Sequence, residues 1–312
     1  MRPIRLGIVG VGKIARDHHI PSIIANSSYC LTAASSRNAQ APGVKNFQSI
    51  GEMLAKLPEL DAVAICTPPQ LHYEAARLAL TSGKHVLLEK PPCASFMQLM
   101  HLESLAAVHA VTLYQTWHSQ HARGVMPAAL LLRQRKLAGV RVTWKEDVRV
   151  WHPGQSWIWQ AGGFGVFDIG FNPLSILTRL IEEPILPRAA TLYVPANCET
   201  PIAATAQLVT ASGVEILLEL DFRQSGTQTW DIDMETDAGA LKLAAGGSRL
   251  TGDSALADEN TLASEYQSIY QRFAELVEHK RVEVDARPMQ LVADIFLIAR
   301  RVAVEPFIDV DR

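Results

Sequence analysis

The ten residues LGIVGVGKIA, numbers 6–15, join a short apolar run to a glycine turn and the start of a helical pattern. Gly10 permits a tight turn, and Gly12 lets the backbone come close to a pyrophosphate. Ala15 is small enough for a helix to pack closely on the strand before it. Glycine turns after strands are common, so the prediction of a dinucleotide site rests on this position between a strand and a helix.

The helix that follows the turn is predicted to begin at Lys13 and Ile14. The first N–H groups of a helix have no partner within the helix, and its dipole favours negative charge at this end. We therefore expect Lys13 and Ile14, with the two glycines, to border the phosphates of a bound dinucleotide.

Composition narrows the class of protein. A chain of 312 residues exceeds a single core, so two domains are expected. The net charge of −3 makes nucleic acid an unlikely partner, and no apolar run reaches the length of a membrane span. A strand starting at residue 4 leaves no room for a signal peptide, which favours a cytoplasmic location. Neither a disulfide framework nor a metal site is expected, because the four cysteines are scattered: Cys30, Cys66, Cys93 and Cys198.

Residues 1–122 are predicted to form an α/β domain with a doubly wound parallel sheet of the Rossmann type. Short apolar strands alternate with helical patterns, as expected for strands covered on both faces. The expected strands are Ile4–Val9, Cys30–Ser35, Ala62–Cys66, His85–Glu89 and Val111–Tyr114. The expected helices are Lys13–Ile24, Ile50–Leu57, Leu71–Ser82 and Phe96–Ala107.

Residues 123–312 are predicted to form an α+β domain with an open, largely antiparallel sheet, because consecutive strands lack helices between them. The expected strands are Val140–Val148, Ala189–Pro195, Ala203–Thr210, Val214–Arg223, Trp230–Thr236 and Ala240–Ala244. The expected helices are Gly124–Lys136, Phe167–Ile181, Ser264–Glu278 and Pro288–Val302, and the last of these could pack back on the first domain. Residues 252–260 are typical of a surface loop.

The end of the second strand bears on the choice of cofactor. NAD sites usually carry an Asp or Glu about 20 residues beyond the glycine motif, but this region reads ASSR at residues 34–37. Ser36 and Arg37 suit a 2′-phosphate, since a guanidinium meets phosphate with two parallel hydrogen bonds. We expect NADP, with NAD also accepted; a solvated arginine at a strand end is the alternative.

Two further strands end in residues suited to a cofactor crevice, because ligands of open α/β sheets bind at the carboxyl ends of the strands. After the third expected strand, Cys66, Thr67 and Pro68 are candidate cofactor contacts. His72 is a further candidate, with a packed or capping role as the alternative.

After the fourth expected strand come Glu89 and Lys90. A lysine there would stabilise a developing alkoxide, and Glu89 would orient the lysine or the nicotinamide ribose. A solvated surface pair is the alternative.

In the second domain, Asp168 and Asn172 are four residues apart and would share one helix face. A carboxylate in apolar surroundings can act as a general base. Asp168 could instead cap this helix, and Pro173 predicts that the helix starts late or bends.

Aromatic residues concentrate between positions 117 and 159. Flat rings interleaved with polar side chains suit a sugar, which has apolar faces and a ring of hydroxyls. An aromatic core is the alternative, and we expect some of these tryptophans to be structural. The rings are Trp117, Trp144, Trp151, Trp157 and Trp159, and the polar candidates for sugar binding are His118, Glu146 and His152.

Together these motifs resemble the glucose–fructose oxidoreductase/inositol dehydrogenase (Gfo/Idh/MocA) family, over nearly the whole chain. The first-domain signatures are GIVGVGKIARDHHIP at Gly7–Pro21, CTPPQLHYE at Cys66–Glu74 and HVLLEKPP at His85–Pro92. WKEDVRVWHPGQSWIW at Trp144–Trp159 and GVFDIGFNPLSI at Gly165–Ile176 are similar to aldose 1-dehydrogenases acting on L-arabinose or D-galactose.

The resemblance implies an NAD(P)-dependent oxidation of an aldose at the anomeric carbon, giving a lactone. It implies that Lys90 is catalytic and that Asn172 stands where many members have a histidine, leaving proton removal to Asp168, Lys90 or a water. Lys90 and Asn172 would hold the reacting hydroxyl. It also implies a homo-oligomer formed through the second-domain sheet.

Two other functions remain open: a sugar- or NADP-sensing regulatory protein of the same fold, and another sugar or inositol dehydrogenase.

Overall fold

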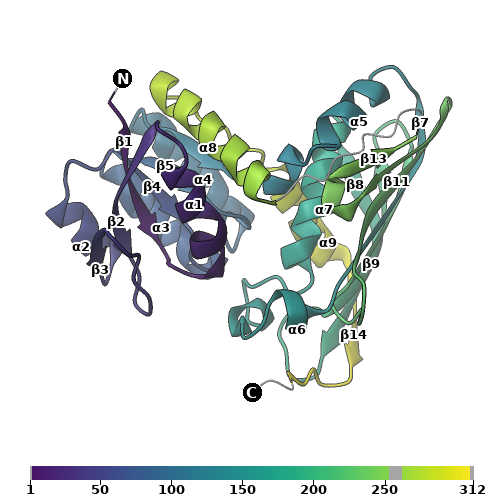
Figure 1. Cartoon of the computed structure of the whole chain (residues 1–312). Helices are drawn as coiled ribbons and strands as arrows, with labels where there is room; N and C mark the ends of the chain where they lie inside the picture. Colours follow the sequence, from purple (N-terminus) through teal and green to yellow (C-terminus); the bar gives the residue numbers. More distant parts are fainter. Residues whose placement is uncertain (1, 253–261, 310–312) are drawn as a thin grey trace. The chain divides into compact units, whose positions relative to one another are not determined.

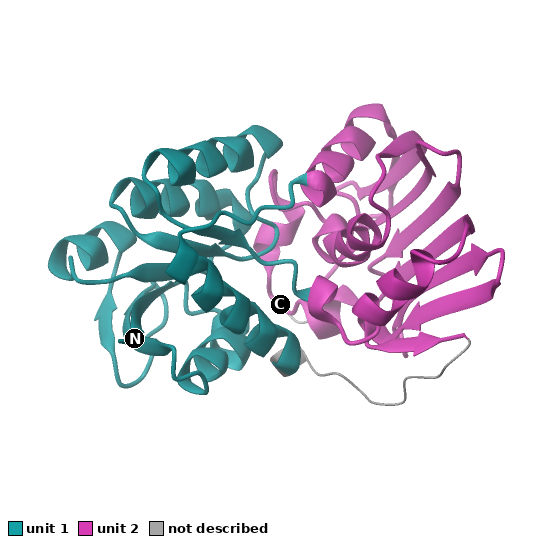
Figure 2. Cartoon of the chain, turned by 90° about the horizontal axis from the view of Figure 1, so that it is seen from above, with its two compact units in different colours: residues 1–118, 262–286 teal, residues 119–261, 287–312 magenta. Residues whose placement is uncertain are grey.

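The computed structural model describes residues 2–252 and 262–309, which fold into two compact units (Figure 2). Unit 1 comprises Met1–His118 and Leu262–Ala286, and unit 2 comprises Ser119–Thr261 and Arg287–Arg312. Residues 262–286 therefore belong to unit 1 although they follow most of unit 2 in the sequence. The sequence predicted a single boundary near residue 122. The loop expected over residues 252–260 lies, from residue 253 on, outside the described residues.

Unit 1 contains a six-stranded parallel sheet with the order β3-β2-β1-β4-β5-β6. This is the strand order of dinucleotide-binding folds, and it confirms the predicted doubly wound sheet. The strands are β1 (Ile4–Val9), β2 (Tyr29–Ser35), β3 (Lys45–Phe47), β4 (Ala62–Ile65), β5 (His85–Leu88) and β6 (Leu113–Gln115). The short edge strand β3 was not predicted.

The helices of unit 1 begin and end at residues that suit those positions. Ser49 Oγ accepts a hydrogen bond from the amide of Glu52 at the start of α2, and Ser95 and Gln98 form a capping box on α4. Gly83, with φ of +71°, follows the end of α3. The helices are the π-helix η1 (Ala15–His19), α1 (Ile20–Ile24), α2 (Ile50–Lys56), α3 (Pro69–Thr81) and α4 (Phe96–Val108).

Helix α8 (Leu262–His279) completes unit 1 and packs near η1 and α1 (Figure 1). It buries Tyr266, Tyr270 and Phe273 completely in the core that Leu6 and Ile8 of β1 also form. Tyr29 of β2 donates a hydrogen bond to the carbonyl of Tyr270 at 2.6 Å. A helix distant in sequence thus closes one face of the nucleotide-type sheet.

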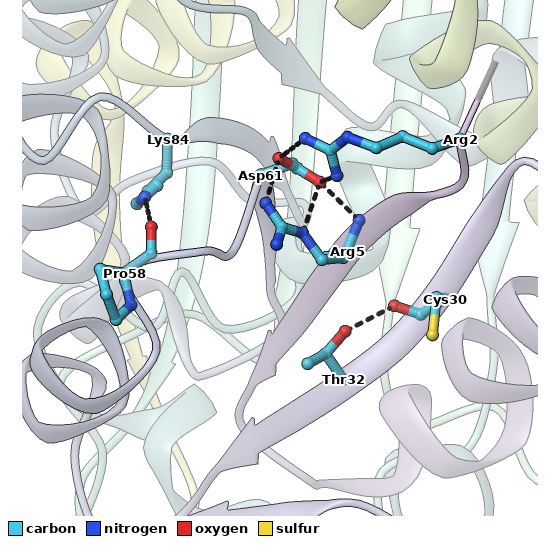
Figure 3. A network of polar contacts seen from close by, with 7 residues as sticks. All are labelled: Arg2, Arg5, Cys30, Thr32, Pro58, Asp61 and Lys84. Carbon is cyan, nitrogen blue, oxygen red and sulfur yellow. Dashed lines mark hydrogen bonds and ion pairs between the residues drawn. The ribbon is translucent and has the colours of Figure 1, made fainter.

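Asp61 forms hydrogen bonds with Arg2 and Arg5, at the start of the first strand of unit 1 (Figure 3). Its carboxylate accepts two hydrogen bonds of 2.8 Å from the guanidinium of Arg2 and one of 2.9 Å from the amide of Arg5. Partial burial acts to raise the pKa of Asp61, but these hydrogen bonds outweigh it and hold the pKa below its ordinary value. Asp61 is therefore ionised wherever the unit is folded near neutral pH.

Unit 2 contains an eight-stranded sheet with the order β13-β12-β11-β7-β10-β9-β8-β14. Pairs β7·β10 and β8·β14 are parallel and the other five are antiparallel, which confirms the predicted open, largely antiparallel sheet. The strands are β7 (Leu137–Lys145), β8 (Ile185–Pro195), β9 (Ala203–Thr210), β10 (Glu215–Asp221), β11 (Thr229–Thr236), β12 (Gly239–Ala244), β13 (Arg249–Thr251) and β14 (Arg300–Val304).

Helices cover one face of this sheet (Figure 1): α5 (Val125–Leu132), α7 (Phe167–Leu180) and α9 (Arg287–Ile298). Side chains alternate along β10, where Ile216, Leu218 and Leu220 are buried and Leu217 is half-buried. A Cβ on Gly170 would lie 2.6 Å from Leu220 Cδ1, so glycine lets α7 approach β10 closely. The short α6 (Val148–Trp151) and the 3-10 helix η3 (Ser156–Trp159) connect β7 to α7.

The helix predicted over 288–302 is shorter in the structure. It ends at Ile298, and residues 300–304 form β14, paired in parallel with β8. Helix α9 packs on β8 and α7 within unit 2. The helix that returns to unit 1 is α8.

Candidate functional site

The glycine turn after β1 has the backbone that a dinucleotide requires. Gly10 has φ of +91°, and a Cβ there would lie 2.8 Å from the amide nitrogen of Thr67. A Cβ on Gly12 would meet nothing within 4 Å, so open space adjoins this backbone. Ala15 is completely buried. The turn thus offers room for a pyrophosphate beside Gly12, as the sequence motif predicts.

Residues 13–24 form one continuous helical stretch, as predicted, with a π-helical segment at Ala15–His19. Lys13 forms an ion pair with Asp17, and Ile14 precedes the π-helical segment. The wider π turn coincides with the burial of His19, whose ring is completely inaccessible.

Ser36 and Arg37 follow β2 at the carboxyl edge of the sheet. The amide of Ser36 donates to the carbonyl of Phe47 at 3.0 Å, and the Arg37 side chain is exposed. A hydroxyl beside an exposed guanidinium suits the 2′-phosphate of NADP, which remains a prediction.

The carboxyl ends of β4, β5 and β6 lie side by side. Ile65 pairs with Leu88, and Leu88 pairs with Gln115, so the residues just beyond these strands share one edge. Cys66, Thr67 and Pro68 follow β4, while Glu89 and Lys90 follow β5. The hydroxyls of Thr67 and Thr116 are buried without a hydrogen-bond partner, as expected of polar groups that a ligand completes.

His72 lies inside unit 1 and is completely buried. Its Nδ1 is 2.9 Å from the carbonyl oxygen of Pro91, and its Nε2 contacts the carbonyl oxygen of Thr67. Both ring nitrogens therefore join the loops after β4 and β5. This matches the packed role given above as the alternative, and a direct cofactor contact of His72 stays a prediction.

Glu89 is the centre of a buried polar network. Its Oε1 accepts a hydrogen bond of 2.5 Å from Tyr266 and lies 3.1 Å from Nε2 of His19, while Oε2 accepts one of 2.6 Å from the amide of Lys90. Burial acts to raise the pKa of Glu89, but the hydrogen bond and charge of His19 outweigh burial and bring the pKa to about 2. Glu89 therefore fixes the backbone at Lys90, as an anion.

Tyr266 also packs against two histidines of unit 1. The rings of His18 and His118 stack against it, with centroids 5.3 and 5.9 Å away. His118 Nδ1 lies 2.8 Å from Oε2 of Glu265. The structure thus places His118 in unit 1 and pairs it with a carboxylate of α8.

Asp168 lies in the first turn of α7 and is 3% exposed. The helix begins at Phe167, with Val166 as N-cap, so Asp168 does not cap it. It also runs through Pro173 to Leu180 and does not start late. Asn172 lies one turn beyond Asp168 on the same face, as predicted.

Two glycines fix the entry into α7. A Cβ on Gly163 would lie 2.0 Å from the carbonyl oxygen of Trp157, and a Cβ on Gly165 would lie 2.2 Å from that of Pro201. Gly165 also has φ of +56°, in the left-handed region. The GGFG segment therefore positions Asp168 by close backbone packing.

Glu146, His152 and Asp168 come together within unit 2. His152 Nε2 is 3.1 Å from Oε1 of Glu146, and His152 Nδ1 is 3.9 Å from Oδ2 of Asp168. The first contact has the distance of an ion pair but not the angles of a hydrogen bond. Trp230 Nε1 donates to Oε2 of Glu146 at 2.9 Å. The predicted proton acceptor and two predicted sugar-binding residues thus form one cluster.

The tryptophans divide between structure and surface. Trp117 is buried in unit 1, where its Nε1 donates to the carbonyl of Asp285 at 2.9 Å. Trp144 is buried and stacks on Trp230, whereas Trp151 is 41% exposed and meets the edge of Trp230. Trp151 and Trp230 therefore form an aromatic pair that is joined to Glu146 through the Trp230 indole.

Sequence reasoning missed four residues of these networks: His19, Tyr266, Glu265 and Trp230. The two adjacent histidines after the glycine motif, His18 and His19, could have indicated a buried polar contact. Histidine is uncommon on the buried side of a helix. The other three depend on long-range packing, for which the linear sequence offers no signal.

The geometry defines a nucleotide-type unit with a lysine after β5 and a second unit with a buried carboxylate beside an imidazole. Residues 4–116 match the oxidoreductase family with an NAD-binding Rossmann fold, Gfo/Idh/MocA. The chain is 42% identical to galactose 1-dehydrogenase of Pseudomonas fluorescens, over 99% of this chain and all of that protein. The chain therefore belongs to the Gfo/Idh/MocA family of oxidoreductases, and it is a sugar dehydrogenase that uses a nicotinamide cofactor.

Solved structures agree with this assignment. The crystal structure of D-galactose-1-dehydrogenase from Rhizobium etli is 46% identical, with a TM-score of 0.93 over 98% of each chain. A 3-ketoreductase from Actinomadura kijaniata, solved with NADP and TDP-benzene, shares the fold at 21% identity, with a TM-score of 0.85 over 97% of this chain and 99% of that one. Among residues 2–252 and 262–309, no helix is both long and apolar enough to cross a bilayer.

Proposed function

We propose that this protein oxidises L-arabinose, D-galactose or both at the anomeric carbon, with NADP or NAD as the hydride acceptor and the lactone as product. The observation that carries the proposal is the similarity to galactose 1-dehydrogenase over both units. The open space beside Gly12 fits the cofactor pyrophosphate, and Ser36 with Arg37 suits the 2′-phosphate of NADP.

The proposed chemistry divides between two side chains. Asp168 accepts the proton of the anomeric hydroxyl, and Lys90 stabilises the negative charge that develops on the hydroxyl oxygen. Asn172 aligns that hydroxyl, because a carboxamide both donates and accepts hydrogen bonds. When bound, the nicotinamide supplies the hydride-accepting carbon, and the protein supplies position and charge.

Sugar recognition is assigned to further polar side chains of the two units. Glu146 and His152 bind ring hydroxyls beside the aromatic surface of Trp151 and Trp230, since flat rings suit the apolar faces of a pyranose. His118 recognises a further hydroxyl through its imidazole. L-Arabinose, D-galactose and D-fucose share ring stereochemistry and differ at carbon five, so we expect at most about 10- to 200-fold discrimination among them.

The test is reduction of NADP and of NAD with these three sugars, followed by two variants. Lys90→Ala and Asp168→Ala should each lower kcat by about 100-fold or more while cofactor binding persists. Lys56→Ala and Glu182→Ala, on exposed positions of each unit, serve as matched controls. Tight cofactor binding without turnover on any aldose would favour a sensing protein, and near-normal turnover of both variants would refute the assigned roles.

We also propose a cytoplasmic homo-oligomer formed through the face of the unit 2 sheet opposite its helices. Leu217 is half-buried there among polar neighbours, and Lys145 pairs with Glu219 at 2.6 Å. Analytical ultracentrifugation should show a dimer or larger assembly that Leu217→Asp dissociates. A monomeric wild-type chain at micromolar concentration would exclude it.

A further inference from the structure

His152 lies between two buried carboxylates and a cavity. Its ring faces Glu146 at 3.1 Å through Nε2 and Asp168 at 3.9 Å through Nδ1. The side chains of Glu146 and Asp168 are 3% and 4% exposed, whereas that of His152 is 16% exposed. Of these three side chains, the imidazole therefore has the greatest access to solvent.

Three separate elements hold this arrangement. Glu146 follows β7 and is fixed by the indole N–H of Trp230 on β11. His152 ends α6, where its amide donates to the carbonyl of Val148 at 2.8 Å, and its ring packs on Phe222. Asp168 comes from α7. Because all three elements belong to unit 2, the cluster forms within one compact body.

The solvent side of His152 is a cavity of about 480 Å³ within unit 2. Its lining contains His152 but neither Glu146 nor Asp168. Trp159 and Phe307 provide apolar walls, and the volume accommodates several water molecules. His152 is thus the member of the cluster that borders this space.

We propose that His152 relays the substrate proton from Asp168 to water in this cavity. The relay rests on the function proposed above. As the C1–H hydride leaves for the nicotinamide, the O–H proton of the anomeric hydroxyl passes to the Asp168 carboxylate. The resulting carboxylic acid gives that proton to Nδ1 of His152, and the imidazolium then loses a proton to water. Asp168 is returned to its carboxylate form, and each turnover releases one proton.

The relay needs the neutral tautomer of His152 with its proton on Nε2. In that tautomer the N–H lies on the side of Glu146, and the lone pair of Nδ1 lies on the side of Asp168. A lone pair facing a carboxylate is consistent with the 3.9 Å separation, which can shorten once a proton lies between the two groups. Asn172 cannot take this role, because its amide does not titrate.

The charged groups around His152 also suit a transient cation. Glu146 and Asp168 face its ring from β7 and α7, and Glu199 and Asp309 line the same cavity. Arg149, on α6 itself, is paired with Asp147 at 2.7 Å. The charged side chains around His152 are therefore mostly carboxylates.

The test is His152→Ala, with imidazole added to the assay. The variant should lower kcat by about 10- to 100-fold, in addition to any rise in KM from the loss of its sugar contact. Imidazole, which fits the cavity, should restore a large part of kcat in proportion to its unprotonated form, and substituted imidazoles should rescue according to their basicity. His109→Ala, on an exposed position of unit 1, is the matched control and should show neither loss nor rescue.

The outcomes separate the relay from other roles. A raised KM with unchanged kcat would mean that His152 only binds sugar, and a folded variant without rescue would also overturn the relay. If His152→Ala fails to fold, His152→Gln replaces it; because a carboxamide cannot carry the proton, an undiminished kcat in that variant would overturn the relay. An inactive wild type would overturn the proposed function and the relay together, whereas an active wild type with an indifferent variant would overturn the relay alone.

Discussion

Gly10 and Gly12 belong to one motif of unit 1 but differ in backbone conformation and surroundings. Gly10 has a left-handed backbone and no room for a Cβ. Gly12 lies outside that backbone region and beside open space. We therefore expect its lack of a side chain to serve a ligand and not the fold.

We accordingly predict that Gly12→Ala leaves the melting temperature nearly unchanged but weakens NADP and NAD binding by about tenfold or more. The methyl group would occupy the space beside the pyrophosphate without touching protein atoms. Fluorescence titration with the reduced cofactor measures the affinity. Gly51→Ala in α2, where a Cβ has ordinary contacts, is the control and should bind the cofactor normally. An unchanged affinity in Gly12→Ala would place the pyrophosphate elsewhere.

At the residue scale, positions set by local patterns could be predicted. Glu89 and Lys90 follow an apolar strand, and Asp168 and Asn172 lie on one helix, as expected, whereas their roles stay predictions. Trp230 could not be assigned, since its place beside Glu146 depends on the register that pairs it with Trp144. That register is set between β7 and β11, more than 80 residues apart.

At the scale of elements, α8 connects the nucleotide-type sheet to the loop that bears Lys90. Its Tyr266 donates to the buried Glu89 carboxylate, and Glu89 in turn accepts the amide of Lys90. Burial next to this anion raises the pKa of Tyr266, so the phenol keeps its proton. The helix therefore acts on the candidate site through one hydroxyl.

Tyr266→Phe should lower the free energy of unfolding by about 1–3 kcal/mol, because a buried carboxylate loses a charge-assisted hydrogen bond. Urea unfolding measures the loss. Tyr73→Phe on α3 removes an exposed hydroxyl that contacts His101 and should cost much less. Equal stability of the two variants would contradict the account of α8.

The hydrogen bonds of the Asp61 carboxylate stabilise the start of β1. Because they depend on its negative charge, we expect the free energy of unfolding to depend on pH. Asp61→Asn should destabilise the protein by about 1–2 kcal/mol at neutral pH. The folded pKa lies below the unfolded value of about 3.9, so the stabilisation is complete above that value and is lost as pH falls through the folded pKa.

Urea unfolding at neutral and acid pH should therefore show the wild type and Asp61→Asn converging on acidification. Glu74→Gln, which removes an exposed pair with Arg77, should match the wild type throughout. A difference that persists unchanged at low pH would mean that the carboxylate charge is not the cause.

Helices and strands could be predicted where their burial produces a simple pattern of apolar residues in the sequence. The strands of unit 1 except β3 read as short apolar runs, because helices cover both faces. Strand β3 has three residues, two of them exposed, which is too short and polar for such a pattern. Residues 300–304 read RRVAV directly after α9, and their pairing with β8 identifies them as a strand.

For the whole molecule, the sequence predicted two fold classes but not the path of the chain. The return of residues 262–286 to unit 1 depends on Tyr266, Tyr270 and Phe273 filling a core whose other half lies near the N-terminus. The pattern of an amphipathic helix indicates that one face is buried, but it does not indicate which sheet that face covers.

For the whole molecule, we propose above all that this chain oxidises an aldose at carbon one. Mixing the purified protein with D-galactose or L-arabinose and oxidised cofactor, while recording reduced nicotinamide and identifying the sugar product, tests that claim most directly. The account predicts cofactor reduction with NADP or NAD, equimolar lactone or its aldonic acid, and loss of both signals in Asp168→Ala. Oxidation at another ring carbon, or no reduction with any aldose while the cofactor binds, would contradict it.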